Sequence, residues 1–191
     1  RRRDAVTVPT EFEPREKRSF EVGHVHALWH SDFHFGSLPV VNERGEWNKP
    51  ILLAFLDDCS RMVLHLQWYL FEDTQAFVHG LTQAILKRGL PRALLTDNGA
   101  GYRSTIHAIA CRALRIRHLR TRPYRPQTNG KAERFIRTLL HGWAHGATYR
   151  SSAERTAALD GWLWHYNHRR RHSALGHQAP ISRTNLLGSY T

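Results

Sequence analysis

Hydrophobic and polar positions along the first half of the chain predict three strands in succession. Val25 to Phe35 is rich in Trp, Phe and His and predicts the first strand. Ile51 to Leu56 is a continuous apolar run, which is typical of a strand buried on both faces. Between Met62 and Leu70 apolar side chains recur at every second position, and this period predicts the third strand. The Gly, Pro and Asn residues within 36–50 favour a hairpin region between the first two strands.

The second half of the chain changes to a helical period, with short strands between the helices. Its predicted elements are a helix capped by Asp73 or Thr74 and ended by Gly89, a strand at 93–96, a helix from Ser104 to Leu114, a strand at 116–121, a helix at 129–143 and a helix from Ser151 or Ser152 to Trp164. The order βββαβαβα predicts an α/β domain, with a mixed five-stranded sheet flanked by helices and a C-terminal helical extension. This order matches the ribonuclease H-like fold.

Three segments are expected along the chain. Residues 1–22 mix charge with two prolines and predict an N-terminal arm or linker, 23–147 form the core domain, and 148–191 form a C-terminal helix and basic tail. The chain begins with three arginines and has its only methionine at Met62, so we expect it to be a piece of a longer protein.

The net charge of the chain indicates what kind of molecule it binds. Twenty-eight Lys and Arg residues against sixteen Asp and Glu give a formal charge of +12, which favours a polyanion such as nucleic acid or an anionic membrane. No apolar run approaches the roughly 20 residues that span a bilayer, and no signal-peptide pattern opens the chain, so nucleic acid is the better expectation. Cys59 and Cys111 lie far apart without metal-ligand spacing, which argues against a disulfide framework or zinc finger and suits a reducing cytoplasm.

Three acidic residues stand out only when they are considered together. Alone, Asp32 within a strand indicates an ion pair, Asp97 before Asn98-Gly99 indicates a turn, and Glu133 in a helix indicates a solvated surface. Between Asp97 and Glu133, however, no other acid occurs among thirty-five residues, which include eight basic ones: Arg103, Arg112, Arg115, Arg117, Arg120, Arg122, Arg125 and Lys131. Isolated carboxylates on a basic surface suit a metal-dependent phosphodiester enzyme, because the acids concentrate Mg²⁺ where the basic surface holds the DNA backbone.

The chain resembles the integrase-core transposases of bacterial insertion sequences over about residues 24–183. The resemblance is carried by the strings HSDFHFGS, FLDDCSR, LLTDNGAGYRS, PYRPQTNGKAERFIRTL and WHYNHRRRHSALGHQAPISR. Its most specific parts are TDNG, separated by thirty-five residues from the Glu of NGKAER, and YNHRRRHSALG near the end. The resemblance implies a ribonuclease H-like integrase catalytic core whose catalytic and metal-binding triad is Asp32, Asp97 and Glu133. Asp57-Asp58 is an alternative first ligand, although this pair also predicts a turn or an ion pair to Arg61.

The function implied by this resemblance is that of a DDE transposase/integrase, a polynucleotidyl transferase and endonuclease. Two Mg²⁺ ions, or Mn²⁺ in their place, would support cleavage at a transposon end and then strand transfer into target DNA. The implied partners are transposon-end and target DNA and further copies of the chain, at least as a homodimer, in the bacterial nucleoid and without a membrane. Candidate DNA-binding residues are Asn129, Lys131, Arg134, Arg137, Arg125, Arg169, Arg170 and Arg171.

Three rival interpretations remain at this point. His24-Val25-His26, followed by His30 and His34, has neutral imidazoles that suit Zn²⁺ and would indicate a zinc-dependent hydrolase. A catalytically silent DNA-binding or interaction module could keep the triad without turnover. A ribonuclease H-type nuclease would use the same metals, although the YNHRRRHSALG segment weighs against it.

Overall fold

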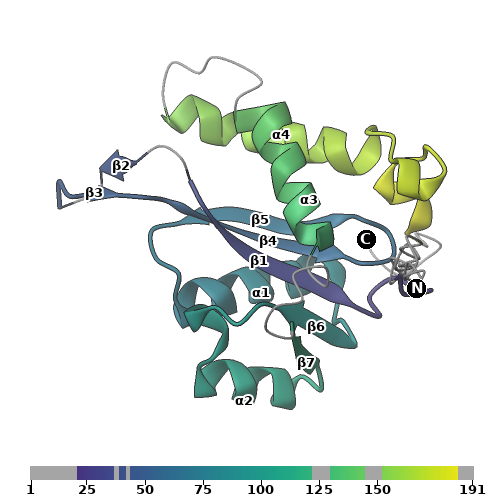
Figure 1. Ribbon diagram of the computed structural model, residues 1–191, viewed down its shortest axis with the longest axis horizontal. Helices are drawn as coiled ribbons and strands as arrows, with labels where there is room; N and C mark the ends of the chain where they lie inside the picture. The colour runs from purple at the N-terminus through teal and green to yellow at the C-terminus, as the bar shows by residue number, and fades with distance from the viewer. Residues whose placement is uncertain (1–20, 37–38, 42–43, 122–129, 145–151, 185–191) are drawn as a thin grey trace, which may run out of the picture.

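A computed structural model describes residues 21–36, 39–41, 44–121, 130–144 and 152–184 of the 191-residue chain, and its centre is a mixed five-stranded sheet (Figure 1). The strand order is β5-β4-β1-β6-β7, as the α/β prediction requires. The strands are β1 (Trp29–Phe35), β4 (Ile51–Asp57), β5 (Val63–Tyr69), β6 (Ala93–Thr96) and β7 (Arg117–Arg120), and a separate two-stranded ribbon is formed by β2 (Val40–Val41) and β3 (Trp47–Asn48).

Strand direction decides which strand ends lie at the same end of the sheet. β4 pairs antiparallel with both β1 and β5, whereas β1, β6 and β7 pair in parallel. β1, β5 and β6 therefore all run in the same direction, and the residues that follow their carboxyl ends lie at the same end of the sheet. β4 runs the opposite way, so Asp57 at its end lies opposite Trp29 at the start of β1.

Helices cover both faces of the sheet (Figure 1). The helices are α1 (Thr74–Arg88), α2 (Thr105–Ala113), α3 (Gly130–Leu139) with a π-helical turn at Leu140–Ala144, and α4 (Ser152–His168), with 3₁₀ turns at Ala100–Tyr102, Ser173–Leu175 and Pro180–Arg183. The predicted caps of the first two helices are confirmed. Asp73 accepts a hydrogen bond from the Ala76 N–H, Ser104 accepts one from the His107 N–H, and Gly89 ends α1 at a φ of 81°.

Two hydrophobic clusters fill the space between sheet and helices, and β4 contributes to both. Leu53 and Phe55 belong to the cluster under α1 and α2, whereas Leu52, Ala54 and Leu56 belong to the cluster under α3 and α4. This division explains the continuous apolar run, because alternate side chains of a strand point to opposite faces. The helical residues in the second cluster are Phe135, Ile136, Leu139, Trp143, Leu159 and Tyr166.

Some element boundaries differ from the prediction. The first strand begins at Trp29 rather than Val25, because His26 has a φ of 62° and the Ala27 N–H bonds to the His24 carbonyl, which makes a turn there. The last turn of the third helix is π-helical, and α4 continues to His168, beyond the predicted end at Trp164. Within the described residues, no helix is both long and apolar enough to cross a membrane.

The C-terminal YNHRRRHSALG segment packs against the sheet. Both polar groups of the Asn167 amide bond to Val63 on the edge strand β5, with its Oδ1 accepting from the backbone N–H and its Nδ2 donating to the carbonyl, each at 2.9 Å. Tyr166 is buried and makes edge-to-face contacts with Phe135 and His172. Part of this motif therefore has a structural role, fixing α4 to an otherwise unpaired sheet edge.

Candidate active site

Asp32 lies in the middle of β1, on the face of the sheet that α3 covers. On the opposite face Ser31 and Phe33 contact Tyr102, which belongs to the cluster under α1 and α2. Because strand side chains alternate between faces, Asp32 and His30 point the other way. Asp32 is opposite Ala54 of β4, a member of the α3 cluster, and is itself only partly exposed.

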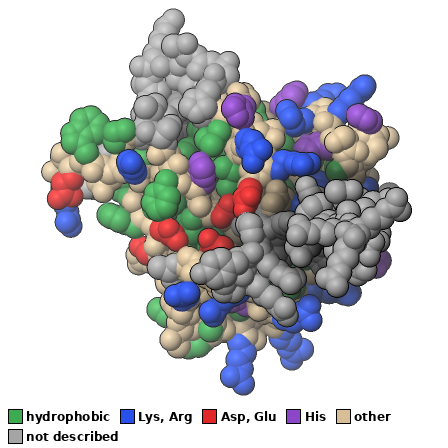
Figure 2. Space-filling model, in the orientation of Figure 1, with side chains coloured by type: hydrophobic (Ala, Val, Ile, Leu, Met, Phe, Trp, Pro, Cys, Tyr) green, Lys and Arg blue, Asp and Glu red, His purple; other side chains and the backbone are tan. Residues whose placement is uncertain are grey.

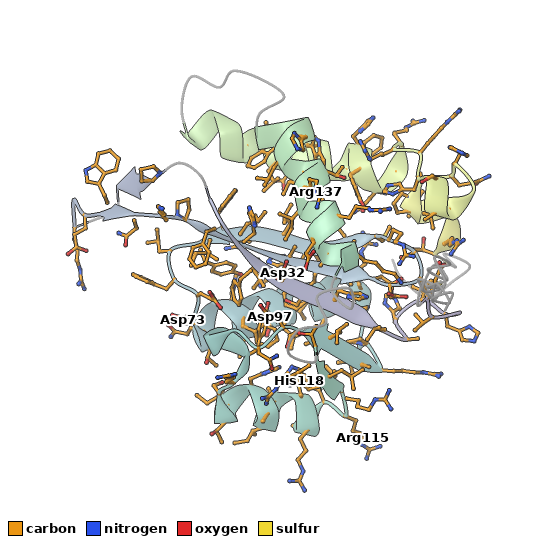
Figure 3. The ribbon with its side chains drawn as sticks, viewed as in Figure 1. Asp32, Asp73, Asp97, Arg115, His118 and Arg137 are labelled. Carbon is orange, nitrogen blue, oxygen red and sulfur yellow. The ribbon has the colours of Figure 1, made fainter. Side chains whose placement is uncertain are left out.

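Asp97 follows the last residue of β6 and comes level with Asp32. In the parallel pairing Trp29 lies opposite Leu94 and His30 opposite Leu95, and continuing this register by two residues aligns Asp32 with Asp97. Neighbouring strands are about 4.8 Å apart, so the two carboxylates start from adjacent backbone positions. Figure 3 shows Asp32 and Asp97 near one another at the centre of the molecule.

The Asp97-Asn98-Gly99 turn, predicted from its sequence, holds the Asp97 side chain in place. Asp97 Oδ1 accepts the Gly99 N–H at 2.8 Å, and Asn98 Nδ2 donates to the carbonyl of Thr121 at 2.9 Å, tying the turn to the end of β7. A Cβ at Gly99 would lie 2.6 Å from Glu72 Oε1 and 3.0 Å from Asp97 Oδ1. Glycine lets both carboxylates approach the turn this closely, and a larger residue would displace the Glu72 side chain.

Glu133 lies in the first turn of α3 and is exposed. Ala132, Phe135 and Ile136 on the same helix are buried against the sheet. This packing holds Glu133 at the flank of the helix, next to the strand that carries Asp32. The closeness of the two acids is evident in the electrostatics of Asp32.

The pKa of Asp32 is raised from its ordinary 3.8 to about 7, chiefly by burial and then by the charges of Asp97, Glu133 and Glu72, against a lowering by a hydrogen bond from the Phe33 backbone. A carboxylate that is partly desolvated and surrounded by other carboxylates is destabilised in its ionised form. A cation bound between these acids would remove that cost. The three predicted acids therefore lie close enough for their charges to act on one another, and we call them one electrostatic unit.

Glu72 is a fourth acid of this unit and was not singled out by the sequence analysis. It follows β5, which runs parallel to β1 and β6, so it lies at the same end of the sheet as Asp97. Burial raises the pKa of Glu72, and the charge of Asp97 adds to the effect. The only signal in the sequence was an acid directly after a strand, and its direction became known only with the sheet order.

Asp57 and Asp58 do not belong to this unit. Asp57 is the last residue of β4 and lies opposite the start of β1, away from Asp97. Its Oδ2 accepts from the N–H and the hydroxyl of Ser60, each at 2.7 Å. Asp58 lies in the turn between β4 and β5, and its carboxylate is 3.8 Å from Arg61 Nη1. The predicted turn and the ion pair to Arg61 are confirmed.

The fit of a metal depends on the number of ions. Among the residues that the structure describes, no group of three His, Cys, Asp or Glu side chains is arranged to hold one metal ion. Asp32, Asp97 and Glu133 would be the residues that hold Mg²⁺, and each ion of a pair would need fewer protein ligands than a single ion. Hard carboxylate oxygens are the ligands that Mg²⁺ prefers, and the raised pKa of Asp32 indicates a place where a cation would be stabilised. The chemistry of this donor set suits Mg²⁺.

The zinc interpretation finds no support in the described residues. His26 Nδ1 accepts a hydrogen bond from Trp29 Nε1, and His30 Nε2 lies 2.6 Å from Asp58 Oδ1, so the two imidazoles serve different partners. Burial lowers the pKa of both His26 and His34. These histidines do not converge on one point.

The predicted DNA-binding residues on α3 differ in their surroundings. Arg134 and Arg137 are exposed, whereas Lys131 Nζ lies 2.5 Å from the buried carboxylate of Asp58. The predicted DNA contact of Lys131 therefore competes with a structural ion pair. Asn129, Arg125 and the loop 123–127 lie outside the described residues.

The predicted arginines after α4 are all exposed. The Arg169 guanidinium lies over the ring of Trp164, 5.6 Å from its centroid, and the His168 ring stacks against the same indole. Arg170 and Arg171 extend this basic surface. On the face shown in Figure 2, acidic side chains gather near the middle and Lys and Arg side chains lie around them.

Comparison with known proteins gives two matches to models of the integrase core domain, one over residues 24–126 and one over residues 114–180. An uncharacterized protein of insertion element IS136 from Agrobacterium fabrum is 30% identical over 86 residues, covering 45% of this chain and 44% of the relative. Transposase InsD of insertion element IS2D from Escherichia coli is 29% identical over 134 residues, covering 65% of this chain and 44% of the relative. The chain thus spans less than half the length of these two relatives.

Two solved structures share the fold at low sequence identity. The simian T-cell lymphotropic virus intasome matches with a TM-score of 0.68 and 22% identity, over 90% of this chain and 59% of that one. The HTLV-2 integrase catalytic core domain in complex with magnesium matches with a TM-score of 0.64 and 19% identity, over 84% of this chain and 97% of that one. The predicted ribonuclease H-like fold is confirmed. Because one family model alone matches more than half of the 191 residues, the chain belongs to the integrase core domain family.

Proposed function

We propose that this chain is the catalytic core of a DDE transposase/integrase, which cleaves DNA at a transposon end and joins the freed 3′-OH to target DNA. The observation that carries the proposal is the effect of the charges of Asp97 and Glu133 on Asp32, with Asp97 directly after the strand that pairs with β1. Membership of the integrase core domain family and the likeness to a transposase support the same reaction class.

Asp32, Asp97 and Glu133 would hold two Mg²⁺ ions, with Mn²⁺ able to replace them. When bound, such ions lower the pKa of a water and stabilise the departing 3′ oxygen. The chain's own residues set the geometry for this chemistry. The Gly99 N–H fixes the rotamer of Asp97, the sheet register fixes Asp32 beside it, and the buried face of α3 brings Glu133 to the same place.

Basic residues supply the affinity for DNA. Arg134 and Arg137 are exposed on the helix that carries Glu133, so they can contact backbone phosphates while the acids face the scissile bond. Phosphate contacts of this kind give affinity and register rather than sequence choice. Transposon-end and target DNA are the proposed partners, and two ends would be paired by at least a dimer of the chain.

The experiment is a joining assay with pre-cut transposon-end DNA and a supercoiled plasmid, in Mg²⁺ or in EDTA. The variants Asp97→Asn and Glu133→Gln should abolish Mg²⁺-dependent joining while DNA binding, measured by fluorescence anisotropy, stays within about twofold of the wild type. Asp160→Asn, at an exposed acid on α4, is the matched control and should join normally. Joining by either triad variant would refute the assignment of the site.

A further inference from the structure

A buried carboxylate outside the triad connects the strand that carries Asp32 to the helix that carries Glu133. The Asp58 side chain is fully buried. Its Oδ1 accepts from His30 Nε2 at 2.6 Å and from Lys131 Nζ at 2.5 Å, and its Oδ2 accepts from the Val22 N–H at 2.9 Å. Arg61 also donates to the Asp58 backbone carbonyl.

The two side chains bound to Asp58 Oδ1 have the same relation to the proposed site. His30 precedes Asp32 by two residues on β1 and points to the same face of the sheet. Lys131 precedes Glu133 by two residues in the first turn of α3. One carboxylate oxygen therefore contacts a side chain two residues before each of two triad residues, on elements far apart in the sequence.

Apolar packing fixes which face of α3 meets the sheet but defines small rotations and slides about that face less sharply. Its buried face consists of Ala132, Phe135, Ile136 and Leu139, and such contacts have no directional preference. A movement smaller than the step of one residue, which is about 1.5 Å and 100°, would keep that face buried and still displace Glu133. The ion pair between Lys131 and Asp58 is directional, so it defines both the rotation and the axial position of the first turn.

Energetics also favour a role in specificity over one in stability. Replacing a buried ion pair with apolar side chains of similar size is often neutral or stabilising, whereas removing one partner leaves an unpaired buried charge and is costly. A pair that adds little net stability can still select one arrangement of the elements it joins.

We propose that Asp58, with His30 and Lys131, is a positioning network that sets the place of Glu133 relative to Asp32, so that both acids can act on the same metal-bound phosphate. This inference rests on the proposed function. Asp58 and Lys131 touch neither metal nor DNA in this role and act through the helix and strand that they join.

The test separates positioning from simple stability. The double variant Asp58→Leu/Lys131→Met removes both charges, and Lys131→Arg keeps the positive charge. Asn167→Ala is the matched control, because it breaks buried hydrogen bonds between α4 and β5 and leaves the Asp58 network intact. Thermal unfolding sets a temperature at which every variant is folded, and all other measurements are made there.

Two readouts are measured on the full chain: Mn²⁺ affinity without DNA, by electron paramagnetic resonance of the free ion, and the Mg²⁺ concentration that gives half-maximal joining. The double variant should bind Mn²⁺ at least tenfold more weakly and need at least tenfold more Mg²⁺, Lys131→Arg should lose less, and Asn167→Ala should match the wild type. Wild-type values for the folded double variant in both readouts would overturn the positioning role. A wild-type chain that binds Mn²⁺ without joining DNA would count against the proposed function alone, and the Mn²⁺ comparison would still decide the positioning role.

Discussion

The raised pKa of Asp32 gives a prediction that does not depend on activity. Asp32→Asn removes a charge that is partly desolvated and repelled by neighbouring acids, while it keeps the shape of the side chain. In the absence of divalent metal, the variant should therefore be more stable than the wild type, and its advantage should grow with pH.

The sign follows from the two protonation equilibria. The folded protein keeps the proton on Asp32 up to about pH 7, whereas the unfolded chain releases it near pH 3.8. The folded state thus binds more protons between these values, and the free energy of unfolding of the wild type falls as the pH rises through this window. Each pH unit corresponds to about 1.4 kcal/mol, so the loss from pH 5 to above pH 7 is about 3 kcal/mol.

The assay is thermal unfolding by circular dichroism at pH 5 and pH 8, in EDTA and in Mg²⁺. For a chain of this size 1 kcal/mol shifts Tm by roughly 2–4 °C, so Asp32→Asn should gain roughly 6–12 °C more over the wild type at pH 8 than at pH 5. Mg²⁺ at pH 8 should raise the Tm of the wild type and leave that of the variant unchanged, because ligand binding stabilises only the form that binds.

Asp160→Asn, at an exposed acid, is the control and should show no pH-dependent gain. An equal gain for Asp32→Asn at both pH values, in EDTA, would show that Asp32 is ordinarily solvated and would remove the electrostatic basis of the site.

Three further predictions concern the turn, the C-terminal helix and DNA binding. Gly99→Ala should weaken joining severalfold with the fold retained, because its Cβ would meet Glu72 Oε1 at 2.6 Å and displace that side chain from beside Asp97. Gly161→Ala, with no atom within 4 Å of its Cβ, should join normally and be more stable by about 1 kcal/mol. Asn167→Ala should lower the free energy of unfolding by about 2–4 kcal/mol in urea titrations, because it leaves the N–H and the carbonyl of Val63 without their side-chain partner. A change under about 0.5 kcal/mol would contradict the structural role of Asn167. DNA affinity should fall at least tenfold between 50 and 200 mM salt, measured by anisotropy, and a flat response would contradict binding through the basic surface.

Local features of the chain were predictable because their signals lie within a few residues. The run from Ile51 to Leu56 indicated a strand buried on both faces, and it lies between two hydrophobic clusters. Asp73 and Ser104 were predicted as helix caps and make the expected hydrogen bonds. The acids of the site were identified by their spacing and by a family resemblance, not by any period of the sequence.

Features that depend on strand order and helix packing could not be predicted in this way. Hydrophobic period shows which face of a strand is buried but carries no information on which strand lies beside it or in what register. Contacts between residues far apart in the chain decide three features of the site. They bring Asp97 beside Asp32, Glu72 to the same end of the sheet, and Lys131 to Asp58.

By itself, the sequence determined the elements, the caps, the basic charge and the candidate acids, since each follows from side-chain chemistry and short-range spacing. The tertiary structure alone decided which acids lie close enough to raise one another's pKa and which charged residues form ion pairs. The physical reason is that Coulomb and hydrogen-bond energies depend on distance in space, and in this fold distance in space is set by the sheet register and the placement of α3.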